Sequence, residues 1–141
     1  MDLRPPVLDG LGLQDAIEWQ AQDFEKRTGI ECIVQVHNLP KLLTPEKATA
    51  FFRIFQETLT NIVRHAQASQ VSVCLKQDNG HVILKVADNG KGIKSSQISD
   101  SKSLGILGMK ERVLPWGGEV DIQGEENKGT TVTIQIQTET T

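Results

Sequence analysis

The spacing of hydrophobic residues along the chain switches between the period of a helix and the period of a strand. Apolar side chains recur every three or four residues over 13–27, and Gly29 follows them, so the sequence predicts a helix that ends there. Over 31–37, apolar and polar residues alternate, which predicts a strand.

A second helix is predicted from the sequence Thr44-Pro45-Glu46. Thr can cap the free amides of a first turn, Pro is tolerated at the first helical position, and Glu favours the positive end of the helix dipole. We expect this helix to continue to about Ala66. One apolar stripe along it is expected to face the core: Phe51, Ile54, Phe55, Leu59, Ile62 and Val63.

Two alternating segments with a turn between them predict a β-hairpin in the middle of the chain. The strands are expected at 71–76 and 82–87, and Asp78-Asn79-Gly80 is typical of a tight turn. Residues 93–102 are mostly polar and include four serines, which predicts a loop.

The last part of the chain is predicted to hold a short helix and a second hairpin. Gly105 and Gly108 precede the helix, Gly117-Gly118 ends it, and strands at 119–123 and 130–137 follow. About five strands and three helices result, without regular alternation. The expected form is an α/β sandwich with helices on one face of a mixed sheet.

Composition and charge exclude several function classes. The chain has 141 residues, 38% of them hydrophobic, which is enough to bury the core of one domain. Its 15 basic and 18 acidic residues give a net charge of −3, and the basic residues are scattered. A protein that binds nucleic acid or an anionic membrane surface is therefore not expected.

Cysteine usage and the lack of long apolar runs indicate the compartment. Cys32 and Cys74 have no Cys or His near them at ligand spacing, so we expect small core residues in a reducing environment. No apolar run approaches the roughly 20 residues that cross a bilayer. We expect cytoplasmic material, either free or cut from a longer membrane protein.

The first of three clusters with candidate chemistry lies on the second helix. Glu57, Asn61 and Arg64 follow at spacings that place them on one flank. An Asn oxygen is a hard ligand for Mg²⁺ and Arg pairs with phosphate oxygens, so this flank is a candidate metal-phosphate site. The alternative is an ordinary solvated helix flank.

The second cluster, Asp88-Asn89-Gly90-Lys91-Gly92, directly follows a strand of the hairpin. A carboxylate at a strand end can accept a hydrogen bond from an exocyclic amine, and Gly90 and Gly92 allow backbone to approach a flat ring or a phosphate. The alternative is an ordinary Asp-Asn-Gly turn.

The third cluster is the glycine-containing start of the short helix, at Gly105 and Gly108. Free amides and the positive end of a helix dipole favour phosphate there. The segment is neither a dinucleotide-binding fingerprint nor a Walker A loop. The alternative is that the glycines permit close helix packing.

Taken in this order, with the closing Gly129-Thr130-Thr131-Val132, the clusters resemble the ATP-binding domain of sensor histidine kinases, within the GHKL group of ATPases. Residues 56–66 resemble the N box, 88–92 the G1 box and 105–112 the G2 box. The Gly-Met-Lys-Glu-Arg ending and the opening 3–8 are similar to the NarL/DesK-partner subgroup. The resemblance implies a two-layer α/β sandwich of the Bergerat type, with a mixed sheet of about five strands covered on one face by three helices.

The resemblance also implies a role for each candidate residue. Asn61 would bind Mg²⁺, Asp88 would accept a hydrogen bond from the adenine amino group of ATP, and Thr130 would support the adenine pocket that Gly90 and Gly92 shape. Glu57 stands where related ATPases place a catalytic carboxylate, and Arg64 would neutralise phosphate charge. Gly105 and Gly108 would let a lid segment fold over the triphosphate.

The partners follow from the same resemblance. Residues 1–12 would be a connector from a dimerisation and phosphoacceptor domain, and 13–141 the ATP-binding catalytic domain. None of His37, His65 and His81 is placed to be the phosphoacceptor, so the chain should bind ATP without phosphorylating itself. A response regulator would receive the phosphoryl group, and the chain alone is expected to be a monomer or a weak dimer.

Two rival functions stay open from the sequence. One is a GHKL ATPase, or a serine kinase that regulates sigma factors, which would share the nucleotide site and differ in the acceptor. The other is a nucleotide-sensing or docking domain without catalysis.

Overall fold

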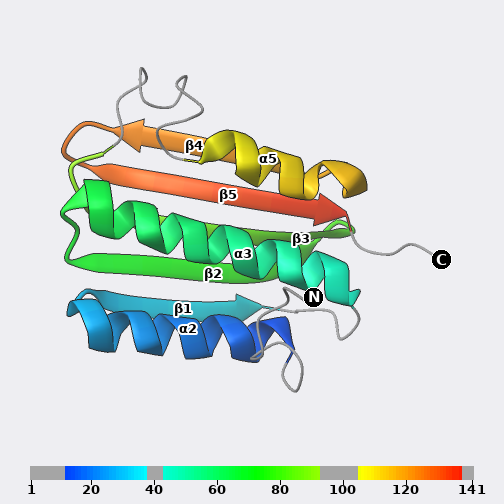
Figure 1. Cartoon of the computed structure of the whole chain (residues 1–141), viewed down its shortest axis with the longest axis horizontal. Helices are drawn as coiled ribbons and strands as arrows, with labels where there is room; N and C mark the ends of the chain where they lie inside the picture. Colours follow the sequence, from blue (N-terminus) through cyan, green and yellow to red (C-terminus); the bar gives the residue numbers. More distant parts are fainter. Residues whose placement is uncertain (1–11, 38–42, 93–104, 138–141) are drawn as a thin grey trace.

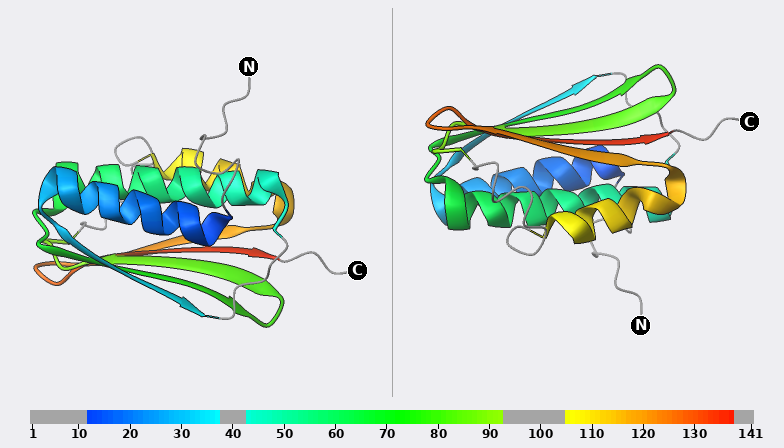
Figure 2. Two further views of the ribbon diagram at one scale, coloured as in Figure 1. Left: turned by 90° about the horizontal axis from the view of Figure 1, so that it is seen from below. Right: turned by 90° about the horizontal axis from the view of Figure 1, so that it is seen from above.

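The computed structural model describes residues 12–37, 43–92 and 105–137. Five strands and three α-helices form two layers, and the views of Figure 2 place every one of these helices on the same face of the sheet. The helices are α2 (Leu13–Thr28), α3 (Pro45–Asn61) and α5 (Ile106–Val113), with a π-helical turn η1 (Ile62–Ala66) and a 3₁₀ turn η2 (Leu114–Trp116). The strands are β1 (Glu31–His37), β2 (Gln70–Asp78), β3 (His81–Asp88), β4 (Glu119–Glu125) and β5 (Gly129–Gln137).

The sheet is mixed, as the sequence predicts. Its strand order is β1-β2-β3-β5-β4 (Figure 1), with β1 parallel to β2 and every other pair antiparallel. Helix α2 packs on β1, α3 on β3 and β5, and α5 on β4. The predicted two-layer sandwich is therefore confirmed.

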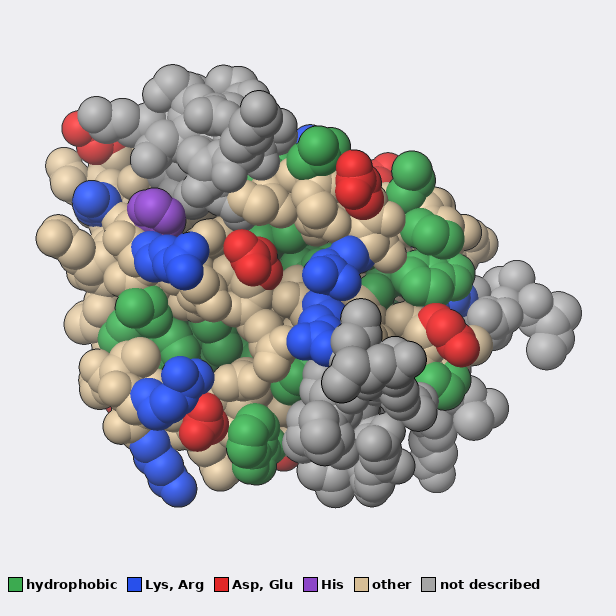
Figure 3. Space-filling model, viewed as in Figure 1, with side chains coloured by type: hydrophobic (Ala, Val, Ile, Leu, Met, Phe, Trp, Pro, Cys, Tyr) green, Lys and Arg blue, Asp and Glu red, His purple; other side chains and the backbone are tan. Residues whose placement is uncertain are grey.

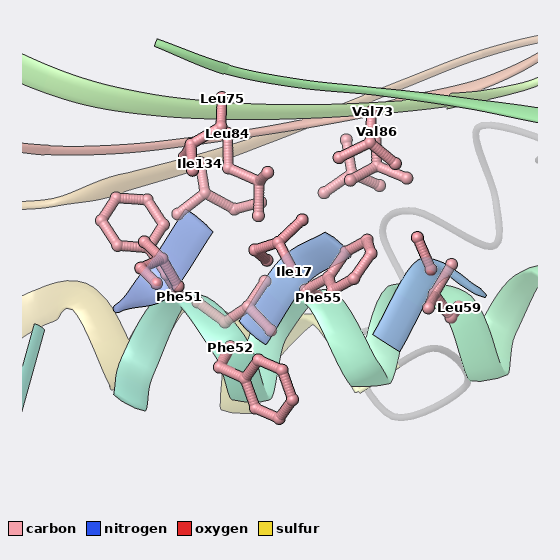
Figure 4. Close-up of a cluster of buried hydrophobic side chains, with 14 of the residues drawn as sticks. Ile17, Phe51, Phe52, Phe55, Leu59, Val73, Leu75, Leu84, Val86 and Ile134 are labelled. Atoms are coloured by element: carbon pink, nitrogen blue, oxygen red, sulfur yellow. The ribbon is translucent and has the colours of Figure 1, made fainter. Parts of the chain in front are cut away.

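The core lies between α3 and the sheet. Phe51 and Phe55 are fully buried and lie on the side of α3 that faces Leu84 and Ile134 (Figure 4). Two positions differ from the predicted stripe. Val63 is 53% exposed, and Phe52, which the stripe omits, is fully buried.

Local signals account for the ends of the first two helices. Thr44 Oγ1 accepts a hydrogen bond from the Lys47 amide at 3.3 Å and Pro45 takes the first helical position, so α3 begins as predicted. Gly29 has a φ of 76° and its amide donates to the Glu25 carbonyl at 2.9 Å, which ends α2. The predicted extension to Ala66 holds, although the last turn is π-helical.

The predicted start of the short helix is wrong by one turn. Helix α5 begins at Ile106, so Gly108 lies inside its first turn and does not precede it. Gly105, with a φ of 67°, is the N-cap residue. The predicted loop at 93–102 and nearly all of the predicted connector at 1–12 lie outside the described residues.

Both cysteines are free thiols and half-buried, which is less burial than the sequence predicts. Burial, with a smaller contribution from the Glu25 carboxylate, raises the pKa of the Cys32 thiol to about 11. Such a thiol stays protonated near neutral pH and is a poor nucleophile. Within the described ranges, no helix is both long and apolar enough to span a bilayer.

Candidate functional site

A pocket opens between α3 and the β3–β5 part of the sheet, and we call it the Asp88 pocket. The space in it that water-sized molecules can occupy is about 20 Å³, and the wider space between its atoms, open solvent included, is about 410 Å³. Apolar side chains dominate its walls, with a few polar groups among them, as in binding sites for small ligands. The lining residues are Thr58, Asn61, Ile62, His65, Ala66, Val86, Asp88, Met109, Ile122, Thr130 and Val132.

Asp88 is the charged group at the base of this pocket. It is the last residue of β3 and is buried. Its Oδ1 accepts a hydrogen bond from the Gly90 amide at 2.8 Å, and the Thr130 amide is a second backbone donor to the carboxylate. Burial raises the pKa of Asp88 above its ordinary value, and these two amides oppose the rise. The carboxylate is thus held at a fixed place by main-chain donors.

The glycines after Asp88 are required by close backbone packing. A Cβ at Gly90 would overlap the carbonyl oxygen of Ala66, and the Lys91 amide donates to that same oxygen at 2.8 Å. A Cβ at Gly92 would overlap the Glu125 carbonyl oxygen. The segment therefore lies directly between η1 and the β4–β5 turn.

Two residues of this corner, Asn89 and Gly129, stand in the quoted motifs, but the sequence analysis assigned neither of them a structural role. Asn89 Oδ1 accepts hydrogen bonds from the amides of Ser69 and Gln70 at 2.9 and 3.0 Å, which fixes the start of β2. Gly129, with a φ of 100°, has no room for a Cβ because the Asp88 carbonyl oxygen is there. The Lys-Gly pair at the end of the last hairpin turn was the available signal for Gly129.

Helix α3 supplies the opposite wall of the pocket. Asn61, its last residue, lines the Asp88 pocket. His65 lines it too, one turn later, although the sequence analysis assigned it no part in ligand binding. Thr58 is buried beside them, and its hydroxyl donates to the Ile54 carbonyl at 2.8 Å.

Arg64 and Glu57 do not line the Asp88 pocket, although the sequence places them on one flank with Asn61. Arg64 lines a second hollow, the α2–α3 groove, together with Phe24, Arg27 and Val63. Figure 3 shows basic and apolar side chains gathered over the ends of α2 and α3. Glu57 is exposed, and its side chain lies against Gly105.

Of the remaining predicted residues, one lines the pocket and another is exposed on α5. Thr130 is buried and lines the Asp88 pocket. Gly108 is exposed on α5, and a Cβ there would meet no atom of the described residues within 4 Å. Met109 and Ile122, which the sequence analysis did not single out, add apolar surface to the pocket.

A protein-only metal cage is absent from the described part of the chain. No group of three or more His, Cys, Asp or Glu residues there could hold a metal ion. Asn61, whose carboxamide oxygen is a hard donor, lines the pocket that Asp88 also lines. This donor set suits an ion such as Mg²⁺ that takes most of its ligands from water and phosphate oxygens.

Comparison with known proteins gives matches along most of the chain. A family model described as histidine kinase-, DNA gyrase B-, and HSP90-like ATPase matches residues 46–140. The chain is 40% identical over 137 residues to the sensor histidine kinase MctS of Rhizobium johnstonii. It is 35% identical over 136 residues to the sensor histidine kinase LiaS of Bacillus subtilis, and 34% identical over 136 residues to the oxygen sensor histidine kinase NreB of Staphylococcus carnosus.

These matches cover 96% of this chain in each case, but only 30%, 37% and 39% of the relatives. The chain thus spans about a third of the length of the curated relatives it matches. Among solved structures, the histidine kinase domain of the Erythrobacter litoralis EL346 blue-light activated histidine kinase superposes with a TM-score of 0.71 at 24% identity. That match covers 89% of this chain and 60% of the other, and at this identity it concerns the fold.

Proposed function

The chain belongs to the family of histidine kinase-, DNA gyrase B- and HSP90-like ATPases, and we propose that it acts as the ATP-binding kinase domain of a two-component sensor histidine kinase. The observation that carries this proposal is the Asp88 pocket. It combines apolar walls with a single buried carboxylate held by backbone amides. Those features suit a flat aromatic base that bears one amino group.

Asp88 selects adenine by its charge. An ionised carboxylate accepts hydrogen bonds and cannot donate, so it pairs with the exocyclic amine of adenine. Guanine presents a carbonyl oxygen at the same position, and two acceptors facing each other in a buried site are unfavourable. Met109, Ile122 and Val132 then contact the faces and edges of the base.

Asn61 and the start of α5 serve the triphosphate. Asn61 would hold Mg²⁺ through its carboxamide oxygen, and the ion would supply positive charge that neutralises the phosphates. Gly108 lies in the first turn of α5, where the free amides and the positive end of the helix dipole favour phosphate oxygens. Arg64 lies outside the pocket and contributes positive charge from the neighbouring groove.

The acceptor of the γ-phosphoryl group is a histidine on another domain. His65 lines the Asp88 pocket itself, and His81 Nδ1 lies 3.1 Å from the Asn79 carbonyl oxygen at a hairpin turn. We assign the acceptor role to neither. The partners we propose are a dimerisation and phosphoacceptor domain in the same longer protein, and a response regulator whose aspartate takes the phosphoryl group onward. The kinase portion would face the cytoplasm, and the chain alone would be a monomer or a weak dimer.

Radiolabel transfer tests this function. The chain is incubated with γ-labelled ATP, alone and with the dimerisation domain of its longer protein, beside the variant Asp88→Asn and the exposed-site control Asp78→Asn. We expect acid-labile label on the added domain only, lost in Asp88→Asn and kept in Asp78→Asn. Rapid phosphate release by the chain alone would instead indicate an ATPase, and label on a serine would indicate a serine kinase.

A further inference from the structure

We propose that Glu57 is a positioning residue whose carboxylate holds the N-terminus of α5 against α3, instead of acting as a base in phosphoryl transfer. This inference rests on the proposed function for its consequence in nucleotide binding. The contact between Glu57 and the start of α5 is independent of the proposed function, because it is present in the protein without nucleotide.

The contact is between a side chain of α3 and the backbone that starts α5. Measured from the place where a Cβ would stand on Gly105, the Glu57 Oε1, Cδ and Cγ atoms lie at 2.8, 3.4 and 3.6 Å. Three successive atoms of the side chain thus run along Gly105. Any residue with a side chain at Gly105 would have to displace the carboxylate.

Helix α5 lacks the groups that usually stabilise a helix start. Gly105, its N-cap residue, has no side chain to accept from the first amides, and its φ of 67° is left-handed. The first turn of α5 contains no acidic residue. Among the described residues, neither the N-cap position nor the first turn of α5 therefore offers an acidic or capping side chain, and a carboxylate near free N–H groups at a helix start is stabilising.

Glu57 supplies that negative charge from a different element. It is exposed and does not line the Asp88 pocket, while Asn61, one turn later on α3, does. On the other side of the contact, Met109 of α5 lines the same pocket. Glu57 thus lies between two helices that both line the pocket, and the role we propose for it is to keep these helices at one separation.

Amide hydrogen exchange on the whole chain without nucleotide tests the contact directly. The variant Glu57→Gln keeps the shape and removes the charge, Glu57→Asp keeps the charge on a shorter side chain, and Glu111→Gln removes an exposed charge from α5 itself. We expect the amides of 106–109 to exchange about two- to fivefold faster in Glu57→Gln, with Glu57→Asp intermediate and Glu111→Gln unchanged.

Titration with ADP gives the second measurement. Glu57→Gln should weaken ADP binding by about two- to fivefold at about 0.05 M salt, and the difference from the parent chain should shrink at about 1 M salt, because charge–dipole attraction is screened. A purely steric role would show no such salt dependence.

The inference would be overturned if Glu57→Gln changed neither the amide exchange at 106–109 nor the ADP affinity. That result is the one expected if Glu57 acts only as a base. If the parent chain bound no nucleotide at all, the proposed function would fail while the exchange experiment still decided the contact.

Discussion

Asn61 and Arg64 are three residues apart in the sequence, yet they line two different hollows of the molecule. Asn61 ends α3 and lines the Asp88 pocket, whereas Arg64 lies in the π-helical turn and lines the α2–α3 groove. One continuous helical segment therefore presents one side to each hollow. The sequence predicts both residues on one metal-phosphate flank, but the structure places them in two hollows. Their contributions to nucleotide binding should therefore be separable by mutation.

Arg64→Ala is expected to weaken binding of an ATP analogue by less than about tenfold and to leave adenosine binding unchanged. Its guanidinium is outside the pocket and exposed, so it acts on phosphates through a screened surface charge, worth about 1 kcal/mol or less. Calorimetric titration with both ligands checks this, with Arg27→Ala as the control for a lost charge in the same groove. An equal loss of adenosine affinity would contradict the conclusion that Arg64 acts on the phosphates and not on the adenine pocket.

Asn61→Ala should reduce the gain in nucleotide affinity that Mg²⁺ provides, with little effect on folding. Asn61 is half-buried at the end of a helix, so its removal should cost about 1 kcal/mol or less in the free energy of unfolding. Titrations with and without Mg²⁺ are compared with the melting temperature of the nucleotide-free protein. An unchanged Mg²⁺ effect, or a melting temperature lowered by more than about 5 °C, would count against the prediction.

Gly90→Ala and Gly108→Ala should change stability in opposite directions. The added methyl at Gly90 overlaps main-chain and side-chain atoms of Ala66, so the backbone must shift at a cost of about 1–3 kcal/mol. At Gly108, inside α5, the methyl meets no atom of the described part of the chain within 4 Å, and alanine favours the helix by about 0.5–1 kcal/mol. Denaturant unfolding measures both, and a Gly90→Ala variant as stable as the parent would refute the packing argument.

The raised pKa of Asp88 predicts how pH acts on folding and on binding. Because the pKa is higher in the folded state than its ordinary value of 3.8, the folded state retains the proton longer, and stability is lost as pH rises from 3.8 through the folded pKa. Asp88→Asn abolishes this loss, so its melting temperature relative to the parent chain should increase over that window. Adenine binding needs the ionised carboxylate and should weaken as pH falls through the same window.

Thermal unfolding and titration across a pH series measure the two effects together. Asp78→Asn, at an exposed strand end, serves as the control. If the difference in melting temperature between Asp88→Asn and the parent chain did not change with pH, burial would not disfavour the ionised form of Asp88.

Elements with strong local signals were predicted from the sequence. The Thr44-Pro45 cap and Gly29 at the end of α2 act within a few residues of chain, as does the Asn79-Gly80 turn, where both residues have positive φ. These features need no knowledge of the tertiary structure.

Features that depend on tertiary packing were not predicted. Helical spacing cannot distinguish Val63 from Phe52, because what buries one and exposes the other is the position of neighbouring elements. A π-helical turn has no reliable sequence signal, and it is the segment that carries Arg64. Glycine is a weak helix former, so Gly108 suggested a later start for α5 than the structure has.

The candidate site also combines residues that the sequence predicted with residues that it did not. Asp88, Asn61 and Thr130 belong to three segments far apart in the chain, and they line one pocket in the structure. The order of the sequence motifs was sufficient to select them as candidates. His65 and Met109 were missed as pocket residues because an isolated His or Met on a helix is most often structural.

The most direct test of the central claim is calorimetric titration of the chain with a non-hydrolysable ATP analogue, beside Asp88→Asn and the corresponding GTP analogue. The account predicts micromolar to submillimolar binding of the adenine nucleotide by the parent chain. It predicts at least about a tenfold loss in Asp88→Asn and in the GTP titration, because each leaves a buried polar group mismatched. Equal binding of both nucleotides, or full affinity in folded Asp88→Asn, would contradict the assignment of the Asp88 pocket to adenine.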